Sequence, residues 1–280
     1  MSLRIKRNIT KTGQALFISQ PALTARLHQI EEELGAKLIY RSGKGTHFTP
    51  QGEHLARCAG DMLARIREIK DQITNMHEEV QGTLRIAAST FMTKYKLPRL
   101  LKLFKEKHPR VELKVITTWS REILNLVHNQ DCHIGFIRGE YPWPNEKQLL
   151  FEETMCLASS EPFQFQDLPH LPRIHYRPDE FAKLQMDNWW RENFTVPPRI
   201  SMEVDRVDTC KEMVLNGHGY AILPRLILNH THGLHTVVLT HKDGTPLTRK
   251  TWMIYRQEMM EINAVDAFVR FSEPFDYYAI

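Results

Sequence analysis

Residues 19–35 read SQPALTARLHQIEEELG and predict an amphipathic helix with both ends marked. Ser19 is a good N-cap, because its hydroxyl can accept from the free backbone N–H groups of the first turn. Pro21 is tolerated in that turn, and Gly35 is a typical C-terminal stop. Apolar residues recur at intervals of four, three and four, which predicts one buried stripe. The stripe consists of Leu23, Leu27, Ile30 and Leu34.

The outward face of this helix carries short or flat polar side chains instead of the lysines and glutamates of an ordinary surface helix. Side chains of this kind can lie close to base-pair edges in the major groove of DNA. Taken alone, the pattern fits a surface helix at least as well, so the interpretation depends on the neighbouring segments. With them, we expect DNA contacts from Ser19, Gln20, Pro21, Thr24, Arg26 and His28.

The segment after this helix predicts a basic β-hairpin. Residues 37–41 alternate like a strand, a second short run ends at Phe48-Thr49, and Gly43 and Gly45 allow a tight turn. Residues 1–45 hold eight Lys and Arg against three acids, while the whole chain has a net charge of only +4. The positive charge therefore gathers at the helix and the hairpin, where Arg41 and Lys44 are expected to meet phosphates.

A heptad pattern runs through residues 55–80, with apolar side chains spaced alternately by four and three. This spacing predicts a long helix with a narrow apolar seam. The seam could pack on its own domain. We favour pairing with the same helix of a second subunit, because a dimer would present two recognition helices to a two-fold DNA site. The seam residues are Leu55, Ala59, Met62, Ile66, Ile69, Ile73, Met76 and Val80.

The run from Thr10 to Gly52 resembles the DNA-binding domain of LysR-type transcriptional regulators, and the likeness covers essentially the whole chain. The resemblance implies an α/β protein with a winged helix-turn-helix over 1–52 and a coiled-coil dimerisation linker helix over 53–80. An effector-binding domain over 81–280, similar to periplasmic solute-binding proteins, is expected to follow. Its first lobe would comprise about 83–154 and 242–280, and its second about 155–241. The matching residues are Leu16, Ser19 to Thr24, Leu27, Ile30-Glu31, Leu34-Gly35, Leu38, Arg41, Phe48-Thr49 and Gly52.

Three departures from the family pattern concern the first domain. The segment ahead of Thr10 is shorter than the family's first helix, Gly13 stands where the family favours alanine, and Ala25 stands where arginine is common. A glycine within a helix costs about 1 kcal/mol. We therefore expect this DNA-binding domain to be less stable than that of full-length relatives, which leaves open whether it still binds DNA.

From residue 82 onward, strand-like and helix-like segments alternate. This order predicts a parallel sheet, whose ligands lie beyond the carboxyl ends of its strands. The expected strands of the first lobe are 83–88, 111–117 and 133–137, with helices at 97–107 and 120–129. The second lobe is expected to contain strands 201–204 and 220–224 and a helix at 209–216. Strands 237–239 and 251–255 and a helix at 262–272 would lead back to the first lobe.

Hydroxyls and free N–H groups at strand ends and helix starts favour a carboxylate or another anion. The expected effector is accordingly an organic acid or an amino acid, and no cofactor is expected. Each candidate could instead be an ordinary cap or loop residue. One departure, His133 where the family usually has Asp, has no explanation in the sequence. The effector-binding candidates are Ser89, Thr90, Thr118, Trp119, Ser120, Arg138, Asp205, Val207 and Thr209.

Other features of the sequence limit the classes of protein to which it can belong. No stretch of 18 apolar residues and no leader-like start are present, and four cysteines are scattered, which favours a reduced, cytoplasmic protein without a membrane anchor. The histidines at 230, 232, 235 and 241 match no zinc spacing, so no metal is expected. No nucleophile and base are spaced as an enzyme requires. We therefore predict a DNA-binding, effector-responsive transcription regulator, as a homodimer or a dimer of dimers. A solute-binding protein or a sensor without effective DNA binding is the alternative.

Overall fold

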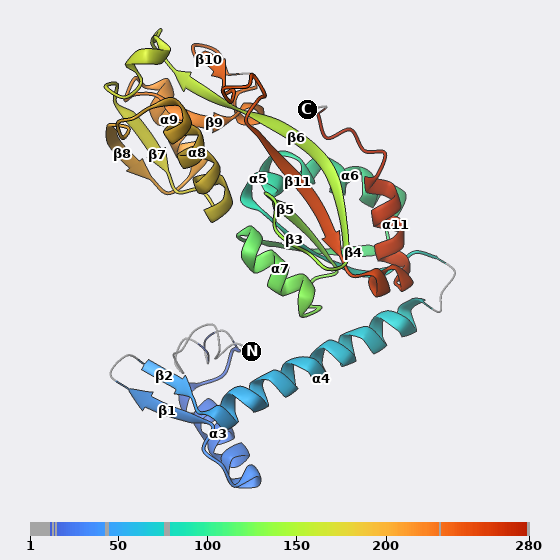
Figure 1. Ribbon diagram of the computed structural model, residues 1–280. Coiled ribbons are helices and arrows are strands. Elements are labelled where there is room, and N and C mark those ends of the chain that lie inside the picture. The colour runs from blue at the N-terminus through green and yellow to red at the C-terminus, as the bar shows by residue number, and fades with distance from the viewer. Residues whose placement is uncertain are drawn as a thin grey trace. The chain divides into compact units, whose positions relative to one another are not determined.

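The computed structural model describes residues 12, 14, 16–42, 45–75, 79–229 and 231–278. The chain divides into two compact units, residues 1–76 and 77–280 (Figure 1). Within the described ranges, no helix is long and apolar enough to cross a lipid bilayer.

Helix α3 (Gln20–Leu34) has the predicted ends. The Ser19 hydroxyl accepts from the Ala22 N–H at 3.3 Å, and Gly35 adopts a left-handed φ of +60°. The predicted buried stripe is wrong in its second half, because Ile30 and Leu34 are 39% and 53% exposed while Leu23 is buried. Leu34 lines an apolar hollow at the end of the helix instead of packing beneath it.

An acid that the sequence did not single out fixes α3 to the hairpin. The Glu31 carboxylate is buried and accepts from the backbone N–H of Leu38 at 2.8 Å and from Lys37 Nζ at 2.8 Å. The hydrogen bond from Lys37, followed by that from Leu38, lowers the pKa of Glu31 to about 2. Glu31 therefore joins the helix to the start of the hairpin as a charged group.

The hairpin consists of β1 (Ile39–Ser42) and β2 (Gly45–Phe48), paired antiparallel. Tyr40 and His47 face each other across it with ring centroids 5.5 Å apart. The predicted turn residues Gly43 and Lys44 lie outside the described residues.

Helix α4 (Pro50–Asn75) follows the hairpin directly. The Thr49 hydroxyl accepts from the Gly52 N–H at 3.0 Å and donates to the Lys37 carbonyl at 2.6 Å. Gly52 is required by close approach, since a Cβ there would lie 1.9 Å from the Leu38 carbonyl oxygen. The start of the long helix is thus packed against the base of the hairpin.

The apolar seam of α4 is open along much of its length. One predicted member, Val80, lies beyond the helix and packs on the core of the second unit, so its assignment to the seam is wrong. Another, Met76, is outside the described residues. Exposed apolar side chains on the helix are Met62, Leu63, Ile66, Ile69 and Ile73, each at least 44% exposed.

The second unit is built on one seven-stranded sheet. The parallel pairing predicted for β3 (Gly82–Ala88), β4 (Val111–Thr117) and β5 (Ile134–Arg138) is confirmed. The sheet as a whole is mixed, because β6 (Glu146–Ser159) and β11 (Thr248–Tyr255) join it antiparallel. The far end of β6 then pairs with β9 (Ala221–Pro224) and β10 (His235–Val238).

Helices cover both faces of this sheet in lobe I, which consists of β3 to β5, the first part of β6, β11, α5 to α7 and α11 (Figure 1). α5 (Thr90–Tyr95), α6 (Leu97–Lys107) and α11 (Asn263–Ser272) surround one aromatic core, in which Phe104 meets Phe268 edge to face at 4.9 Å. α7 (Ser120–His128) packs on β3 and β5.

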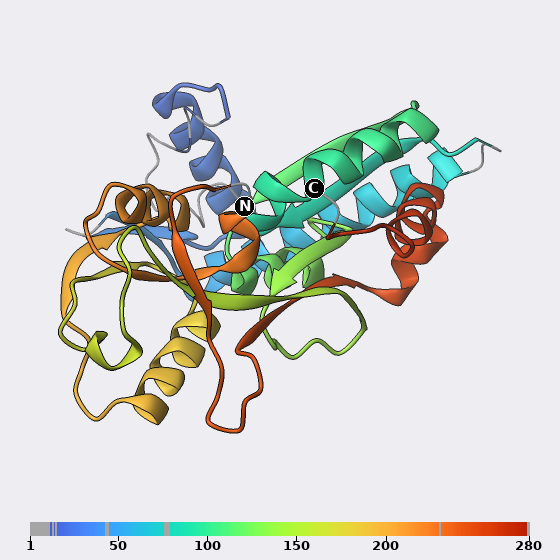
Figure 2. The same ribbon diagram turned by 90° about the horizontal axis from the view of Figure 1, so that it is seen from above.

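Lobe II consists of the last residues of β6, β7 to β10 and α8 to α10. β7 (Arg173–Tyr176) and β8 (Ile200–Val204) form a parallel pair, and α8 (Glu180–Asn193) and α9 (Val207–Leu215) lie on opposite sides of the strands (Figure 2). α10 (Arg225–Leu228) follows β9. Trp189 and Trp190 are buried and pack in the core of this lobe. The sequence did not predict α5, β6, β7, α8 or α10.

Candidate effector pocket and DNA-contact surface

Four helices begin at one pocket between the two lobes. α5 and α7 start there from lobe I, and α8 and α9 start there from lobe II. Of the nine predicted effector residues, eight line this pocket and Thr209, in the first turn of α9, does not. The eight are Ser89, Thr90, Thr118, Trp119, Ser120, Arg138, Asp205 and Val207.

The pocket is small. Its empty volume is about 600 Å³, and part of that space is open to solvent. A molecule of a few heavy atoms fits this arrangement of the lobes better than a large cofactor does.

Two serines fix the strand ends that form the lobe I side of the pocket. Ser89 caps α5 by accepting from the Met92 N–H at 3.4 Å. Ser120 is buried and accepts from the Arg138 N–H at 3.1 Å, which ties the start of α7 to the end of β5. The Ser120 hydroxyl is already used in this hydrogen bond, so the role of Ser120 is to hold the pocket wall in place.

Buried ion pairs form the pocket floor. The Arg138 guanidinium pairs with Glu153 of β6 and lies 3.8 Å from the centroid of the Phe91 ring. Arg249 of β11 pairs with Asp179, which also caps α8 by accepting from the Ala182 N–H at 2.9 Å. The charge of Arg138 is therefore matched by Glu153, and Arg138 stays a predicted effector residue because it lines the pocket.

Free donors remain at the pocket. The N-terminal turns of α7 and α9 have no side-chain cap, so their first N–H groups point to the pocket with the positive ends of the helix dipoles. Arg206 lies 3.6 Å from Asp205, whereas Arg177 makes no ion pair with any described residue. This set of donors suits an anion.

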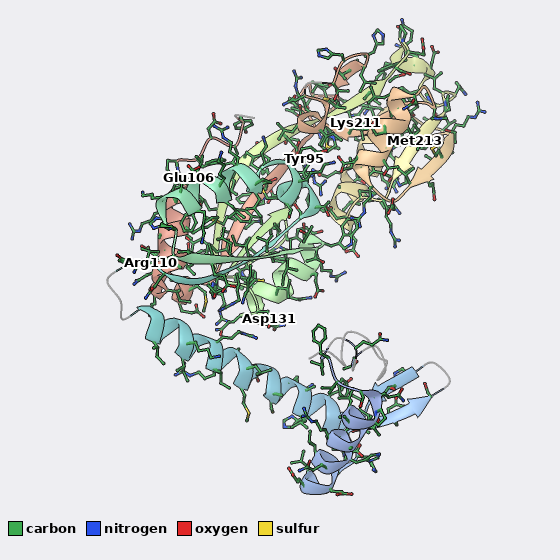
Figure 3. All side chains as sticks on the ribbon, turned by 180° about the vertical axis from the view of Figure 1, so that it is seen from behind. Tyr95, Glu106, Arg110, Asp131, Lys211 and Met213 are labelled. Atoms are coloured by element: carbon green, nitrogen blue, oxygen red, sulfur yellow. The ribbon has the colours of Figure 1, made fainter. Side chains whose placement is uncertain are left out.

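Two contacts connect the lobes beside the pocket. Asp208 of α9 accepts from Tyr95 of α5 and lies 2.7 Å from Lys94 Nζ; Figure 3 shows the labelled Tyr95 beside α9, which carries the labelled Lys211 and Met213. Burial alone would raise the pKa of Asp208, but the hydrogen bonds from Lys94 and Tyr95 outweigh it and lower that pKa. Burial and the hydrogen bond to Asp208 raise the pKa of Tyr95.

The second connection lies on the other side of the pocket. Arg121 of α7 donates to both carboxylate oxygens of Glu180, the first residue of α8, at 3.2 Å. Both side chains are exposed. This arrangement of the lobes is therefore held partly by surface charge pairs, which are individually weak.

The predicted DNA-contact residues form an open surface on the first unit. Ser19, Gln20, Pro21, Arg26 and His28 are exposed, and Thr24 is half-buried, all within the first nine residues of α3 or at its cap. The backbone of Arg41 lies in β1, and Lys44 is outside the described residues. A helix with an exposed N-terminal half beside a hairpin is the arrangement that reads DNA in winged helix-turn-helix proteins.

Both units match known families. Residues 77–274 match the family described as LysR substrate binding domain, and residues 3–53 match the bacterial regulatory helix-turn-helix proteins of the lysR family. The chain belongs to the LysR family. It is a DNA-binding transcription regulator with an effector-binding domain, and its relatives are transcriptional regulators, not enzymes.

Individual relatives agree with this assignment. The uncharacterized HTH-type transcriptional regulator YraN of Bacillus subtilis is 39% identical, with 96% of this chain and 93% of that protein covered. YkuM of the same organism is 34% identical over 94% and 90%. Among solved structures, full-length CbnR in complex with its target DNA has a TM-score of 0.67 at 18% identity, over 97% and 95% of the two chains. The Vibrio cholerae virulence activator AphB gives 0.66 at 17%, over 98% and 96%.

Several pocket residues of this LysR-type regulator were not in the sequence prediction. They come mostly from the segment after β7, where Arg177, Pro178 and Asp179 follow a strand and precede a helix. Asp179 before Glu180 is an N-cap signal that could have been recognised, with Pro178 marking the turn. Arg249 had no such signal, because only the pairing of β11 brings it beneath the pocket.

The structure also explains His133, where the LysR family usually has Asp. His133 is buried, and its Nδ1 accepts from the Arg85 N–H at 3.3 Å while its Nε2 contacts the Arg85 guanidinium. It therefore fastens the start of β5 to β3. Among the described residues no three His, Cys, Asp or Glu side chains gather as a metal site, and His230 lies outside them.

Proposed function

We propose that this LysR-type regulator responds to a small organic anion, either an organic acid or an amino acid, bound between the lobes of its second unit. The observation that carries the proposal is the convergence of four helix N-termini on one small pocket, two of them without a side-chain cap. Backbone N–H groups and helix dipoles at such positions favour negative charge.

Arg177 is the charged anchor in this proposal. It lines the pocket, and no described acid pairs with it. An arginine guanidinium matches a carboxylate with two parallel hydrogen bonds. The free N–H groups at Ser120 and Val207 would take the rest of the carboxylate or a second polar group.

Ligand binding would favour the closed arrangement of the lobes, because the proposed contacts come from both of them. A ligand shifts a conformational equilibrium only by its difference in affinity for the two states. The closed state offers donors from α7 and α9 together, whereas an open state separates them. The same difference would set the coupling between effector and DNA affinity.

We further propose that the DNA is contacted by Ser19, Gln20, Pro21, Thr24, Arg26 and His28 on α3 and by Arg41 and Lys44 on the hairpin. The exposed seam of α4 supports dimerisation, since contiguous apolar patches on soluble proteins commonly mark interaction sites. A dimer would carry two recognition helices, as a two-fold operator requires.

The test is a thermal-shift screen of organic acids and amino acids, followed by calorimetric titration of the best compound into wild type and two variants. Arg177→Met should weaken binding about tenfold or more, because it removes a charge-assisted contact. Arg225→Met, an exposed arginine outside the pocket, is the matched control and should leave binding unchanged.

Two results would contradict the proposal. One is that no acid or amino acid shifts the melting temperature. The other is that Arg177→Met and Arg225→Met bind the best compound equally well, which would place the ligand elsewhere.

A further inference from the structure

Lobe II has a second pocket that shares no residue with the one between the lobes. It lies between the C-terminal half of α8, the following residues 194–198 and the start of β7. Its empty volume is about 700 Å³, including space open to solvent. The walls are mainly aromatic and proline side chains: Trp190, Phe194, Pro197 and Pro198.

A buried cation lines this pocket. The Arg173 side chain is 4% exposed, and its Nε has no hydrogen-bond partner. Among the described residues, no carboxylate lies within 4.0 Å of its guanidinium. The guanidinium carbon instead lies 5.3 Å from the centroid of the Trp190 ring.

A buried guanidinium lowers the stability of a folded protein unless it pairs with an anion. Burial lowers the pKa of Arg173, and the charge of Asp187, which makes no ion pair with it, offsets only part of this cost. The position is nevertheless firmly built, because the Arg173 N–H donates to the Arg199 carbonyl at 2.8 Å. Trp190 Nε1 donates to the Val196 carbonyl at 2.9 Å, which fixes the loop that forms the opposite wall.

We propose that this pocket is a second ligand site, for a monocarboxylate with a flat apolar body whose carboxylate pairs with Arg173. The planar guanidinium matches a carboxylate, and the Trp190 and Phe194 rings, 4.5 Å apart, offer an apolar wall for a flat group. Asp187 and Arg191 also line the pocket, so its charged residues are two arginines and one aspartate, with one positive charge in excess. A singly charged acid therefore suits the site better than phosphate or a dicarboxylate.

The test uses benzoate, with benzamide as the uncharged molecule of the same shape. Both are titrated by calorimetry into wild type and into Thr90→Trp, in which an exposed residue of the inter-lobe pocket is enlarged to block that pocket. Benzoate should bind Thr90→Trp and benzamide should not. This site shares no residue with the proposed effector site, so an experiment can disprove either proposal while the other stands.

Two further changes, made in the Thr90→Trp background, locate the binding. Arg173→Met should weaken benzoate binding about tenfold or more, since it removes the charge-assisted pair. Its melting temperature should be equal or higher, because an unpaired buried charge has been removed. Val196→Trp fills the pocket from an exposed position without touching Arg173 and should weaken binding as strongly. Arg199→Met, an exposed neighbour, should have no effect.

The proposal is overturned if benzoate does not bind Thr90→Trp, if benzamide binds equally well, or if Val196→Trp binds as tightly as its parent. A large fall in the melting temperature of Arg173→Met would show that the arginine serves the fold instead. Val196→Trp then still decides whether the pocket binds the acid.

Discussion

Arg138 and Glu153 form an ion pair in the interior of the second unit, with side chains only 4% and 1% exposed. Removing one partner leaves the other charge buried and unmatched. We expect Glu153→Gln to destabilise the second unit by about 3–5 kcal/mol, measured by urea unfolding. Glu106→Gln on the surface of α6 (labelled in Figure 3) is the control and should change little.

The double variant Arg138→Met with Glu153→Met tests the same reasoning. Replacing both charges by apolar side chains of similar volume is often neutral or stabilising. The double variant should therefore recover most of the stability lost in Glu153→Gln. A double variant as unstable as the single one would mean that the pair contributes through its specific geometry.

The contact between Gly52 and Leu38 leads to a prediction for the first unit. Gly52→Ala places a methyl group 1.9 Å from the Leu38 carbonyl oxygen, so backbone must move, and we expect a loss of about 1–3 kcal/mol and weaker DNA binding. Gly60→Ala on the same helix meets nothing within 4 Å and should be neutral or stabilising by about 0.5–1 kcal/mol. Thermal unfolding of both variants checks the contrast, and equal melting temperatures would contradict it.

Glu31 predicts a pH dependence in the first unit. Its folded pKa of about 2 lies below its ordinary value of 4.5, so its contribution is fully present above about pH 4.5 and is lost as the pH falls towards 2. Glu31→Gln should cost about 1–3 kcal/mol near neutral pH, because the buried Leu38 N–H and Lys37 lose a charged acceptor. The stability gap between wild type and Glu31→Gln should shrink on acidification; a gap that stays constant to pH 3 would rule out this role.

The open seam of α4 predicts an effect on assembly, if the proposed dimer forms through it. Ile66→Glu places a charge among apolar side chains and should weaken dimerisation by about 2 kcal/mol, roughly thirtyfold in the dissociation constant. Arg57→Gln makes the same change in net charge on an exposed residue off the seam. Sedimentation over a concentration series distinguishes them. Unchanged association of Ile66→Glu would place the dimer interface elsewhere.

The sequence predicted those parts of the fold whose causes are local. The N-cap at Ser19, the stop at Gly35 and the heptad spacing of α4 depend on neighbours a few residues away, and the first strands of lobe I follow from alternation with helices. Val80 continued the spacing by coincidence, because periodicity does not show where a helix stops.

The parts that escaped prediction depend on contacts between distant segments. Glu31 reads as one of three surface acids until the hairpin places the Leu38 N–H against it. Arg249 and Asp179 are 70 residues apart and meet only because β11 returns through the sheet. The eight pocket residues could be anticipated from strand ends, whereas the charge balance around them required the tertiary structure.

The course of β6 has a mechanical consequence. Its first half is hydrogen-bonded to β11 in lobe I and its last residues to β9 and β10 in lobe II, so the two lobes share an unbroken ladder (Figure 1). They cannot slide past each other as separate bodies without breaking it. We expect the lobes to open by a twist of these strands, because the hydrogen bonds of β6 tie both lobes to one strand. The angle of opening would then be limited by the strain on those hydrogen bonds.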